Sequence, residues 1–364
     1  MSEEVKIEDN VDAVPAVRVI GVDIGTGMIA CATRNDDPNS KEKKIKLRKV
    51  RDAFMRVDPD EFMAGNAPEF GEKMLKKTGT HFIKLDDALY ILGDSAYEMS
   101  IEMNKELLRP MSKGVLNPNE PESAIMVEEL IKAVAGEPVN PDTDVIFYCV
   151  PADPIDEEYD VAYHKATCEE AIRNIGYKNV SVMNEGLAVI YSELYENNFT
   201  GIGISFGAGM CNVSYANRGM EILKFSIGKG GDYIDQSAAR QVNDTVPVMT
   251  YRKEEGMDIT DPQDEYEKAI AVYYKTLIKY LVQSFIALYR KKDKKELPRL
   301  FKPIPLVVSG GTSLVGGFVE TLDKAIKEEK AFPIKLSEIR HAEEPLYAVS
   351  AGLYQAAKLN ADLS

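Results

Sequence analysis

The sequence predicts an α/β protein built from two similar domains that share one ligand site. Residues 21–28 read Gly-Val-Asp-Ile-Gly-Thr-Gly-Met between two apolar runs, a pattern typical of a glycine-rich β-hairpin. Residues 203–210 read Gly-Ile-Ser-Phe-Gly-Ala-Gly-Met, and their three glycines and methionine match the first stretch at an offset of 182 residues, half of the 364. Similarity at half the chain length indicates a duplicated domain, with both hairpins facing one ligand.

Composition and charge narrow the class of protein. A chain of 364 residues with 45% hydrophobic and 28% charged residues fits a globular protein of two domains. The net charge of −15 argues against direct binding to nucleic acid or to an anionic membrane surface. No run is apolar and long enough to span a bilayer, and the acidic residues 1–15 predict a disordered N-terminus rather than a signal peptide. The four cysteines show no close pairing, as is typical of a cytoplasmic protein.

The remaining elements follow from apolar periodicity and from glycine and proline breaks. Strands are predicted before and after each hairpin and in residues 41–51, 88–92, 144–150, 179–183, 221–227 and 305–309. Helices are predicted in residues 97–108, 122–135, from Pro154 and Asp156 to about 175, 185–195, 264–291 and 318–328, with a last helix beginning within 344–352. Residues 41–51 would complete a meander with the first hairpin, and residues 58–80 predict a small peripheral subdomain.

Residues at several strand ends have the chemistry of an anion or metal site. The glycine turns leave backbone N–H groups open to an anion. Asp23 at the end of the first strand can hold a hydrated divalent cation, and Thr26 can hydrogen-bond a phosphate. Glu185 stands at a strand-to-helix junction where it can orient water, although a carboxylate is also favoured there by the helix dipole alone.

Two further glycine pairs and one possible metal pair complete the candidates. The glycines in residues 228–231 precede a helix and suit a phosphate, with an ordinary helix start as the alternative. The glycines at 310 and 311 follow a buried strand and let a flat ring approach the backbone. His164 and Cys168 lie one helical turn apart and could ligate zinc, but two ligands without partners favour packing instead.

With these motifs in order, residues 17–357 resemble the actin-like ATPase superfamily, which includes actin, MreB, MamK, FtsA, the seventy-kilodalton heat-shock chaperones and the sugar kinases. Residues 109–115 and 344–352 are closer to the bacterial actins MreB and MamK than to the chaperones. The resemblance implies two ribonuclease-H-like α/β domains around a nucleotide cleft. These would be residues 16–198 with an insert at 53–85, and 199–357 with an insert at 231–302, followed by a tail at 358–364.

The resemblance also implies the functional residues. Asp23 would hold Mg²⁺ through water, and Glu185, with Asp23, would form the catalytic pair. The residues expected around ATP lie in the two phosphate loops, the Gly-Gly-Asp segment, a Lys-Glu pair and the adenosine loop: Gly25, Thr26, Gly27, Gly207, Ala208, Gly209, Gly230, Gly231, Asp232, Lys253, Glu254, Gly310, Gly311 and Thr312.

Two departures from the family pattern concern the second phosphate loop. Ser205 stands where the family carries an Asp that holds the waters of the cation, and Met210 stands where a Thr is usual. Serine carries no charge, and the methionine sulfur is only a weak acceptor. We therefore expect ATP binding to persist, but hydrolysis to be slow or impaired, because losing a water-positioning group costs roughly two to four powers of ten in rate.

The resemblance implies a cytoplasmic, ATP-binding protein that polymerises into cytoskeletal filaments. Its expected partners are other copies of itself, ATP or ADP, and an adaptor or cargo protein. A chaperone-like nucleotide switch, a non-hydrolysing adaptor similar to FtsA and a small-molecule kinase are the alternatives. The chain stops near the end of the nucleotide-binding domains, which weakens the chaperone alternative, and no substrate-side carboxylate base was identified for a kinase.

Overall fold

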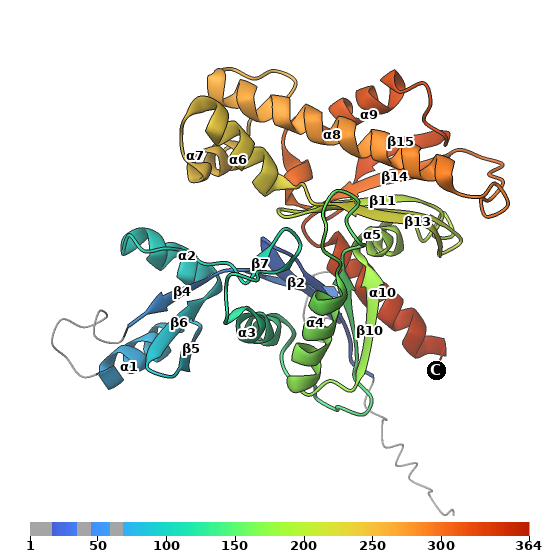
Figure 1. Ribbon diagram of the computed structural model, residues 1–364. Helices are drawn as coiled ribbons and strands as arrows, with labels where there is room; N and C mark the ends of the chain where they lie inside the picture. Colours follow the sequence, from blue (N-terminus) through green and yellow to red (C-terminus); the bar gives the residue numbers. More distant parts are fainter. Residues whose placement is uncertain (1–16, 35–44, 59–67, 364) are drawn as a thin grey trace, which may run out of the picture.

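The computed structural model describes residues 17–34, 45–58 and 68–363, arranged around two five-stranded sheets with helices on their faces (Figure 1). The expected disordered N-terminus at residues 1–15 lies outside this range, as do the start of the strand predicted at 41–51 and part of the segment 58–80. Within the described part of the chain, no helix is both long and apolar enough to cross a membrane.

The first sheet has the strand order β10-β9-β1-β2-β3. Its strands are β1 (Val19–Ile24), β2 (Met28–Arg34), β3 (Ile45–Arg51), β9 (Val145–Val150) and β10 (Asn179–Asn184). The first three strands form an antiparallel meander, as the sequence predicted, and β9 and β10 continue the sheet in parallel with β1.

The second sheet repeats this topology in the order β13-β12-β11-β14-β15. Its strands are β11 (Gly201–Phe206), β12 (Cys211–Asn217), β13 (Met220–Ile227), β14 (Ile304–Ser309) and β15 (Leu336–His341). Ile24 lies opposite Ile29 at the end of the first hairpin, and Phe206 lies opposite Cys211 at the end of the second. Each residue of the second pair is 182 positions after its counterpart in the first pair. The two hairpins therefore have the same strand register, in agreement with the repeat seen in the sequence.

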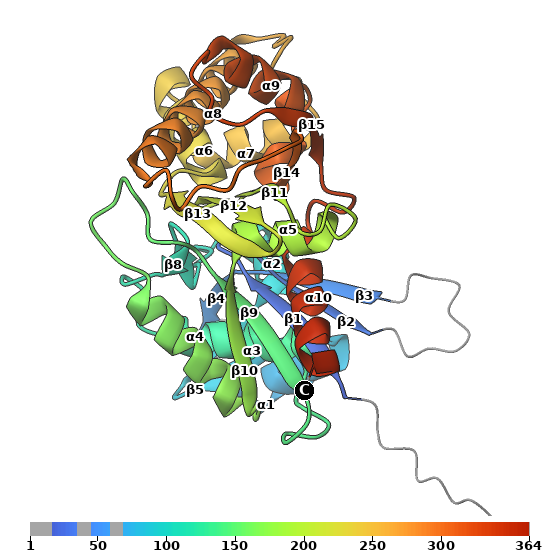
Figure 2. The ribbon, with the colours of Figure 1, turned by 90° about the vertical axis from the view of Figure 1, so that its right-hand side faces the viewer.

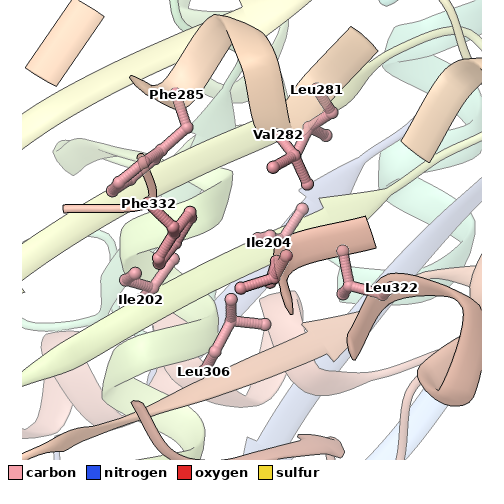
Figure 3. A pocket seen from close by; sticks show the side chains of 9 residues that line it. Ile202, Ile204, Leu281, Val282, Phe285, Leu306, Leu322 and Phe332 are labelled. Carbon is pink, nitrogen blue, oxygen red and sulfur yellow. The ribbon is translucent and has the colours of Figure 1, made fainter. Parts of the chain in front are cut away.

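Long amphipathic helices cover the sheets. α3 (Ser123–Ala135) and α4 (Ala162–Asn174) pack beside the first sheet, and α8 (Glu265–Lys291) and α9 (Phe318–Glu328) beside the second. The α8 helix begins where the Asp264 carboxylate accepts a hydrogen bond from the Glu267 backbone N–H. Its apolar stripe faces β11 and β14 around a small, wholly apolar gap in the core, shown in Figure 3. This gap is a packing defect of the core and has no polar lining.

Two helices each pack on the sheet of the other half of the chain. α5 (Glu185–Glu193) follows β10 but lies against β11 and β12, and α10 (Ala348–Leu363) follows β15 but lies against β1 and β9. The chain therefore passes between the two halves twice, next to a crossing of α5 and α10 (Figure 2). The domain boundary at 198/199 stays a prediction. α10 continues through residues predicted as a tail.

Smaller lobes extend each half. In the first, β4 (Phe54–Val57), β5 (Phe82–Leu85) and β6 (Ala88–Leu92) form a three-stranded sheet with α1 (Pro68–Thr78) and α2 (Gly93–Glu102). This lobe extends beyond the predicted insert at 53–85. In the second, α6 (Gly231–Val242) and α7 (Val246–Glu254) lie within the predicted insert at 231–302. A short hairpin, β7 (Met111–Ser112) and β8 (Val115–Leu116), lies between α2 and α3 in the chain.

Two predicted helix bounds were wrong. The helix predicted at 97–108 begins at Gly93 and ends at Glu102, because Asn104 adopts a left-handed φ of 51° that a helix cannot continue. The helix predicted to open at Pro154 begins at Ala162 instead. The backbone around Ile155 is bonded elsewhere, since its N–H donates to the Ser226 carbonyl over 3.0 Å.

Candidate functional site

The two glycine hairpins have the same turn geometry. The Gly25 N–H donates to the Met28 carbonyl over 3.1 Å, and the Gly207 N–H donates to the Met210 carbonyl over 2.9 Å. In the described structure, the N–H groups of residues 26, 27, 208 and 209 have no backbone acceptor. Each turn therefore presents free donors, the feature that binds an anion.

The hairpins lie directly against one another. A β-carbon added to Gly27 would lie 3.2 Å from the Ala208 β-carbon, and one added to Gly209 would lie 2.5 Å from the Thr26 hydroxyl oxygen. The Thr26 hydroxyl is buried and accepts a hydrogen bond from the Gly114 N–H over 3.0 Å. Glycine is therefore required at Gly209 because the neighbouring loops approach too closely for any side chain.

The Gly-Gly-Asp segment is bonded to the second hairpin. The Gly231 N–H donates to the Gly207 carbonyl over 3.0 Å, and the Asp232 N–H donates to the Ala208 carbonyl over 2.9 Å. A β-carbon on Gly230 would lie 2.4 Å from the Ala208 carbonyl oxygen. The N-terminus of α6 is thus anchored on the hairpin, and two of its N–H groups are already used.

The loop after β14 joins the same cluster. Gly310 has a φ of 88°, and a β-carbon there would lie 2.2 Å from the Phe206 carbonyl oxygen, so only glycine fits. The Thr312 hydroxyl, in the 3₁₀ helix η1 (Gly311–Leu314), donates to the Gly207 carbonyl over 2.9 Å. The structure therefore brings the predicted adenosine loop to the second phosphate loop.

The two residues of the predicted Lys-Glu pair lie in different surroundings. The Lys253 ammonium is 2.7 Å from the Asp235 carboxylate, both side chains are largely buried, and Lys253 also reaches the Gly231 carbonyl at 3.4 Å. The neighbouring Glu254 is exposed, and the structure shows no contact of its side chain with the glycine loops. Lys253 belongs to the cluster, whereas Glu254 is not brought to it.

Asp23 lies near the end of β1, and Glu185 follows the end of β10 as the first residue of α5. The carboxyl ends of parallel strands meet at one edge of a sheet, and β1, β9 and β10 are parallel neighbours. The protein atoms that enclose both carboxylates raise their pKa values, and the negative charge of Asp23 raises the pKa of Glu185 further. The Cys149 thiol, at the end of β9, opposes this by donating to Asp23 over 3.1 Å.

The two departures from the family pattern lie in the same place. Ser205 is buried, and its side chain and that of Asn212 hydrogen-bond to Glu185 and lower its pKa. The Asn212 side-chain oxygen Oδ1 also accepts a hydrogen bond from the Ala152 N–H over 3.2 Å. Met210 packs across to the first half, since a β-carbon on Gly114 would lie 2.3 Å from its sulfur. Ser205 thus contacts the predicted catalytic glutamate directly.

Sequence reasoning missed three members of this site. Cys149 was considered only among the four cysteines without close pairing, although it lies near the end of a strand parallel to β1. Asn212 is one of two asparagines in the returning strand β12, which also carries Ser214, so no local signal singled it out. Arg109 was noted only within residues 109–115 as part of the resemblance to bacterial actins, yet its guanidinium lies 2.8 Å from the Asp232 carboxylate. No short-range pattern places Arg109 there, because the two residues are 123 positions apart.

His164 and Cys168, the pair considered for zinc, lie packed together in the interior of the first half. Both side chains are buried, with the sulfur 3.6 Å from the histidine Nδ1. Burial lowers the pKa of His164 to about 4 and raises that of the Cys168 thiol. Across the described ranges, no three His, Cys, Asp or Glu side chains lie close enough to form a metal site.

Comparisons with known proteins agree with this geometry. A filament structure described as the MamK double helical filament is 17% identical, has a TM-score of 0.65, and aligns over 93% of this chain and 98% of that one. MreB5 of Spiroplasma citri bound to ADP is 11% identical, with a TM-score of 0.64 over 96% and 98% of the two chains. The apo psk41 ParM protein is 13% identical, with a TM-score of 0.53 over 95% and 98%. No match was found among curated proteins.

These likenesses define the class of protein: the chain has the actin-like fold, and the predicted fold class is confirmed. The Volactin family model matches residues 19–357. The chain belongs to the Volactin family.

Proposed function

We propose that this chain is an actin-like protein that binds ATP with Mg²⁺ between its two halves and polymerises into filaments. The observation that carries the proposal is the pair of hairpins with equal turn geometry, placed face to face with free N–H donors. Two such turns suit the adjacent phosphates of one nucleotide better than two separate anions. The neighbours described as a MamK filament and as MreB5 bound to ADP support the same proposal.

The residues present fit a magnesium nucleotide. Mg²⁺ is usually held by one or two carboxylates together with phosphate oxygens and water, and Asp23 and Glu185 supply two carboxylates beside the hairpins. Bound Mg²⁺ would supply positive charge that favours the ionised form of both groups. Asp23 would hold the cation's waters, and Thr312 and Lys253 would line the nucleoside side through the contacts described above.

We further propose that ATP hydrolysis is slow. Glu185 is the group that would orient water, and it is held by Ser205 and Asn212, neither of which carries a charge. The site therefore has one carboxylate fewer than the family pattern. The same feature favours the second candidate function, a non-hydrolysing adaptor similar to FtsA, in which nucleotide only stabilises the fold. All four cysteines are free and buried, which supports the proposed cytoplasmic location.

Binding and assembly are tested separately. Millimolar Mg-ATP should raise the melting temperature, because a ligand that binds only the folded state stabilises it. Asp23→Asn should reduce the Mg²⁺-dependent part of this shift, whereas Asp87→Asn, an exposed control, should leave it unchanged. The absence of any shift with saturating Mg-ATP would refute nucleotide binding.

Electron microscopy with and without ATP then separates the two candidates. Filaments that form with ATP support the cytoskeletal proposal. A protein that binds Mg-ATP yet remains monomeric at high concentration in every nucleotide state would favour the adaptor.

A further inference from the structure

Asp52 is a fully buried carboxylate that lacks partners. It follows β3, has 0% exposure, and neither carboxylate oxygen has a hydrogen-bond partner among the described residues. The backbone N–H of Met111 nevertheless lies near enough to lower the pKa of Asp52. An unpaired buried acceptor is unfavourable because it has lost its hydrogen bonds to water, so this arrangement suits a state in which the usual partner of Asp52 is engaged elsewhere.

Backbone pairing brings the segment that carries Arg109 alongside the segment that carries Asp52, with Arg109 opposite Ala53. Phe54 and Leu108 exchange both hydrogen bonds of an antiparallel bridge, each at 2.9 Å. In such a bridge, the residues that precede Phe54 run alongside those that follow Leu108. Burial raises the pKa of Asp52 well above its usual range, and the nearby Arg109 charge is the main effect that opposes the rise.

The guanidinium of Arg109 is nevertheless bonded to the other half of the molecule. Its Nη1 lies 2.8 Å from Oδ2 of Asp232, at the start of α6. The Arg109 side chain is 41% exposed, so it has room to move. One guanidinium thus acts on two carboxylates: it lowers the pKa of Asp52 in its own half, and it is paired with Asp232 in the opposite half. Only the second is paired in this structure.

Both carboxylates are connected to the glycine hairpins. The Asp52 N–H donates to the Gly27 carbonyl over 3.1 Å, and the Asp232 N–H donates to the Ala208 carbonyl over 2.9 Å. Because these backbone bonds hold each carboxylate at its own hairpin, separating the halves would carry Asp232 away from Arg109. Asp52, in the same half as Arg109, would stay.

We propose that Arg109 is a two-position latch that pairs with Asp232 when the two halves are closed and with Asp52 when they open. The latch deepens the proposed function, because the hairpins that it connects are the proposed nucleotide site. It does not itself require nucleotide. In the open state Asp52 accepts the Arg109 guanidinium. Opening therefore exchanges the Arg109–Asp232 ion pair for an Arg109–Asp52 ion pair instead of leaving Arg109 unpaired.

The test measures the distance between the small lobes without nucleotide. Spin labels at Glu98→Cys on α2 and Gln241→Cys on α6 report this distance by pulsed electron paramagnetic resonance. Both positions are exposed, and the four native cysteines are buried and will not be labelled. In Figure 1 these two helices belong to the lobes on the same side of the molecule.

The latch predicts shifts of opposite sign. Asp232→Asn removes the closed-state partner and should raise the ratio of long to short distances roughly two- to fivefold, as expected for a half-exposed ion pair. Asp52→Asn removes the open-state partner and should lower that ratio. In an Arg109→Gln background neither change should have a further effect. Asp142→Asn, which breaks an exposed ion pair with Lys178, is the charge-matched control and should leave the ratio unchanged.

Asp52→Leu provides a second variant in case the asparagine amide disturbs folding, and melting curves check that each variant is folded. If Asp52→Asn and Asp52→Leu leave the distances as in the parent protein, or shift them in the same direction as Asp232→Asn, Arg109 does not use Asp52 and the proposal is overturned. The measurement is made without nucleotide, so failure of ATP binding would not affect its outcome.

Discussion

Gly352 lies so close to Ala188 that a β-carbon on the glycine would be 1.8 Å from the Ala188 carbonyl oxygen. This contact is the crossing of α10 and α5, the two helices that connect the halves of the molecule. Gly21 makes a similar approach on the other side of α10, where its β-carbon would lie 2.3 Å from the Ser350 carbonyl oxygen. Backbone contacts this close allow no side chain, so α10 is held between α5 and β1.

The first prediction is that Gly352→Ala destabilises the fold. In an exposed helix this change would stabilise by roughly 1 kcal/mol, but here the added methyl group must push two helices apart. We expect a loss of roughly 2–4 kcal/mol, measured by urea unfolding. Asn360→Ala on the exposed face of α10 is the matched control and should be neutral or stabilising. Equal stability of the two variants would show that the crossing is loose.

The second prediction concerns acid and His164. Burial lowers the pKa of this imidazole from 6.5 to about 4. Because the folded-state pKa lies below the unfolded one, the unfolded state binds more protons in this interval, and stability falls as the pH drops from 6.5 to 4. His164→Gln should remove this dependence, with a difference of up to about 1.4 kcal/mol per pH unit. Parallel pH profiles of the two proteins would contradict the assignment.

The third prediction has the opposite sign and concerns Glu185. Burial and the negative charge of Asp23 raise the pKa of Glu185 above the usual 4.5. The protonated side chain therefore contributes stability that is fully present below pH 4.5, and this stability is lost as the pH rises through the higher pKa of the folded state. Without metal, Glu185→Gln should therefore melt several degrees higher than the parent at pH 8, and the gap should close towards pH 4. Glu196→Gln, an exposed control, should show no such gap.

The fourth prediction concerns Ser205→Asp. Without metal, a third carboxylate beside Asp23 and Glu185 should lower the melting temperature. At saturating Mg-ATP the same change should increase phosphate release, because it restores charge beside the cation. Ser205→Asn supplies similar size without charge and should not increase the rate. A parent protein that already turns over as fast as active bacterial actins, or a Ser205→Asp protein that binds ATP but gains no rate, would contradict the proposed role of this residue.

The fifth prediction concerns assembly. A net charge of −15 opposes self-association, and salt screens this repulsion over roughly 10 Å at 0.1 M. Sedimentation of filaments should therefore increase with Mg-ATP and, at fixed nucleotide, with moderate salt. Assembly that falls steadily as salt is added would instead indicate contacts dominated by opposite charges.

The local elements of this protein and its internal repeat can be predicted from short stretches of its sequence. The two hairpins could be predicted because strands joined by glycine turns are encoded within eight residues, and the offset of 182 showed that they are equivalent. The bounds of α8 could be predicted from its apolar stripe, because that stripe is also encoded in a continuous stretch of sequence. The predicted site residues at strand ends were also local signals, and most of them lie together in the structure.

Which distant residues meet depends instead on how the chain packs in three dimensions. The pairing of Arg109 with Asp232, the contact of Cys149 with Asp23 and the isolation of Glu254 depend on how the two halves pack. The start of α4 was missed because Ile155 bonds to Ser226, a residue 71 positions away. Hydrogen bonds and burial across such separations leave no periodic pattern in the chain, because their energy arises only when the halves come together.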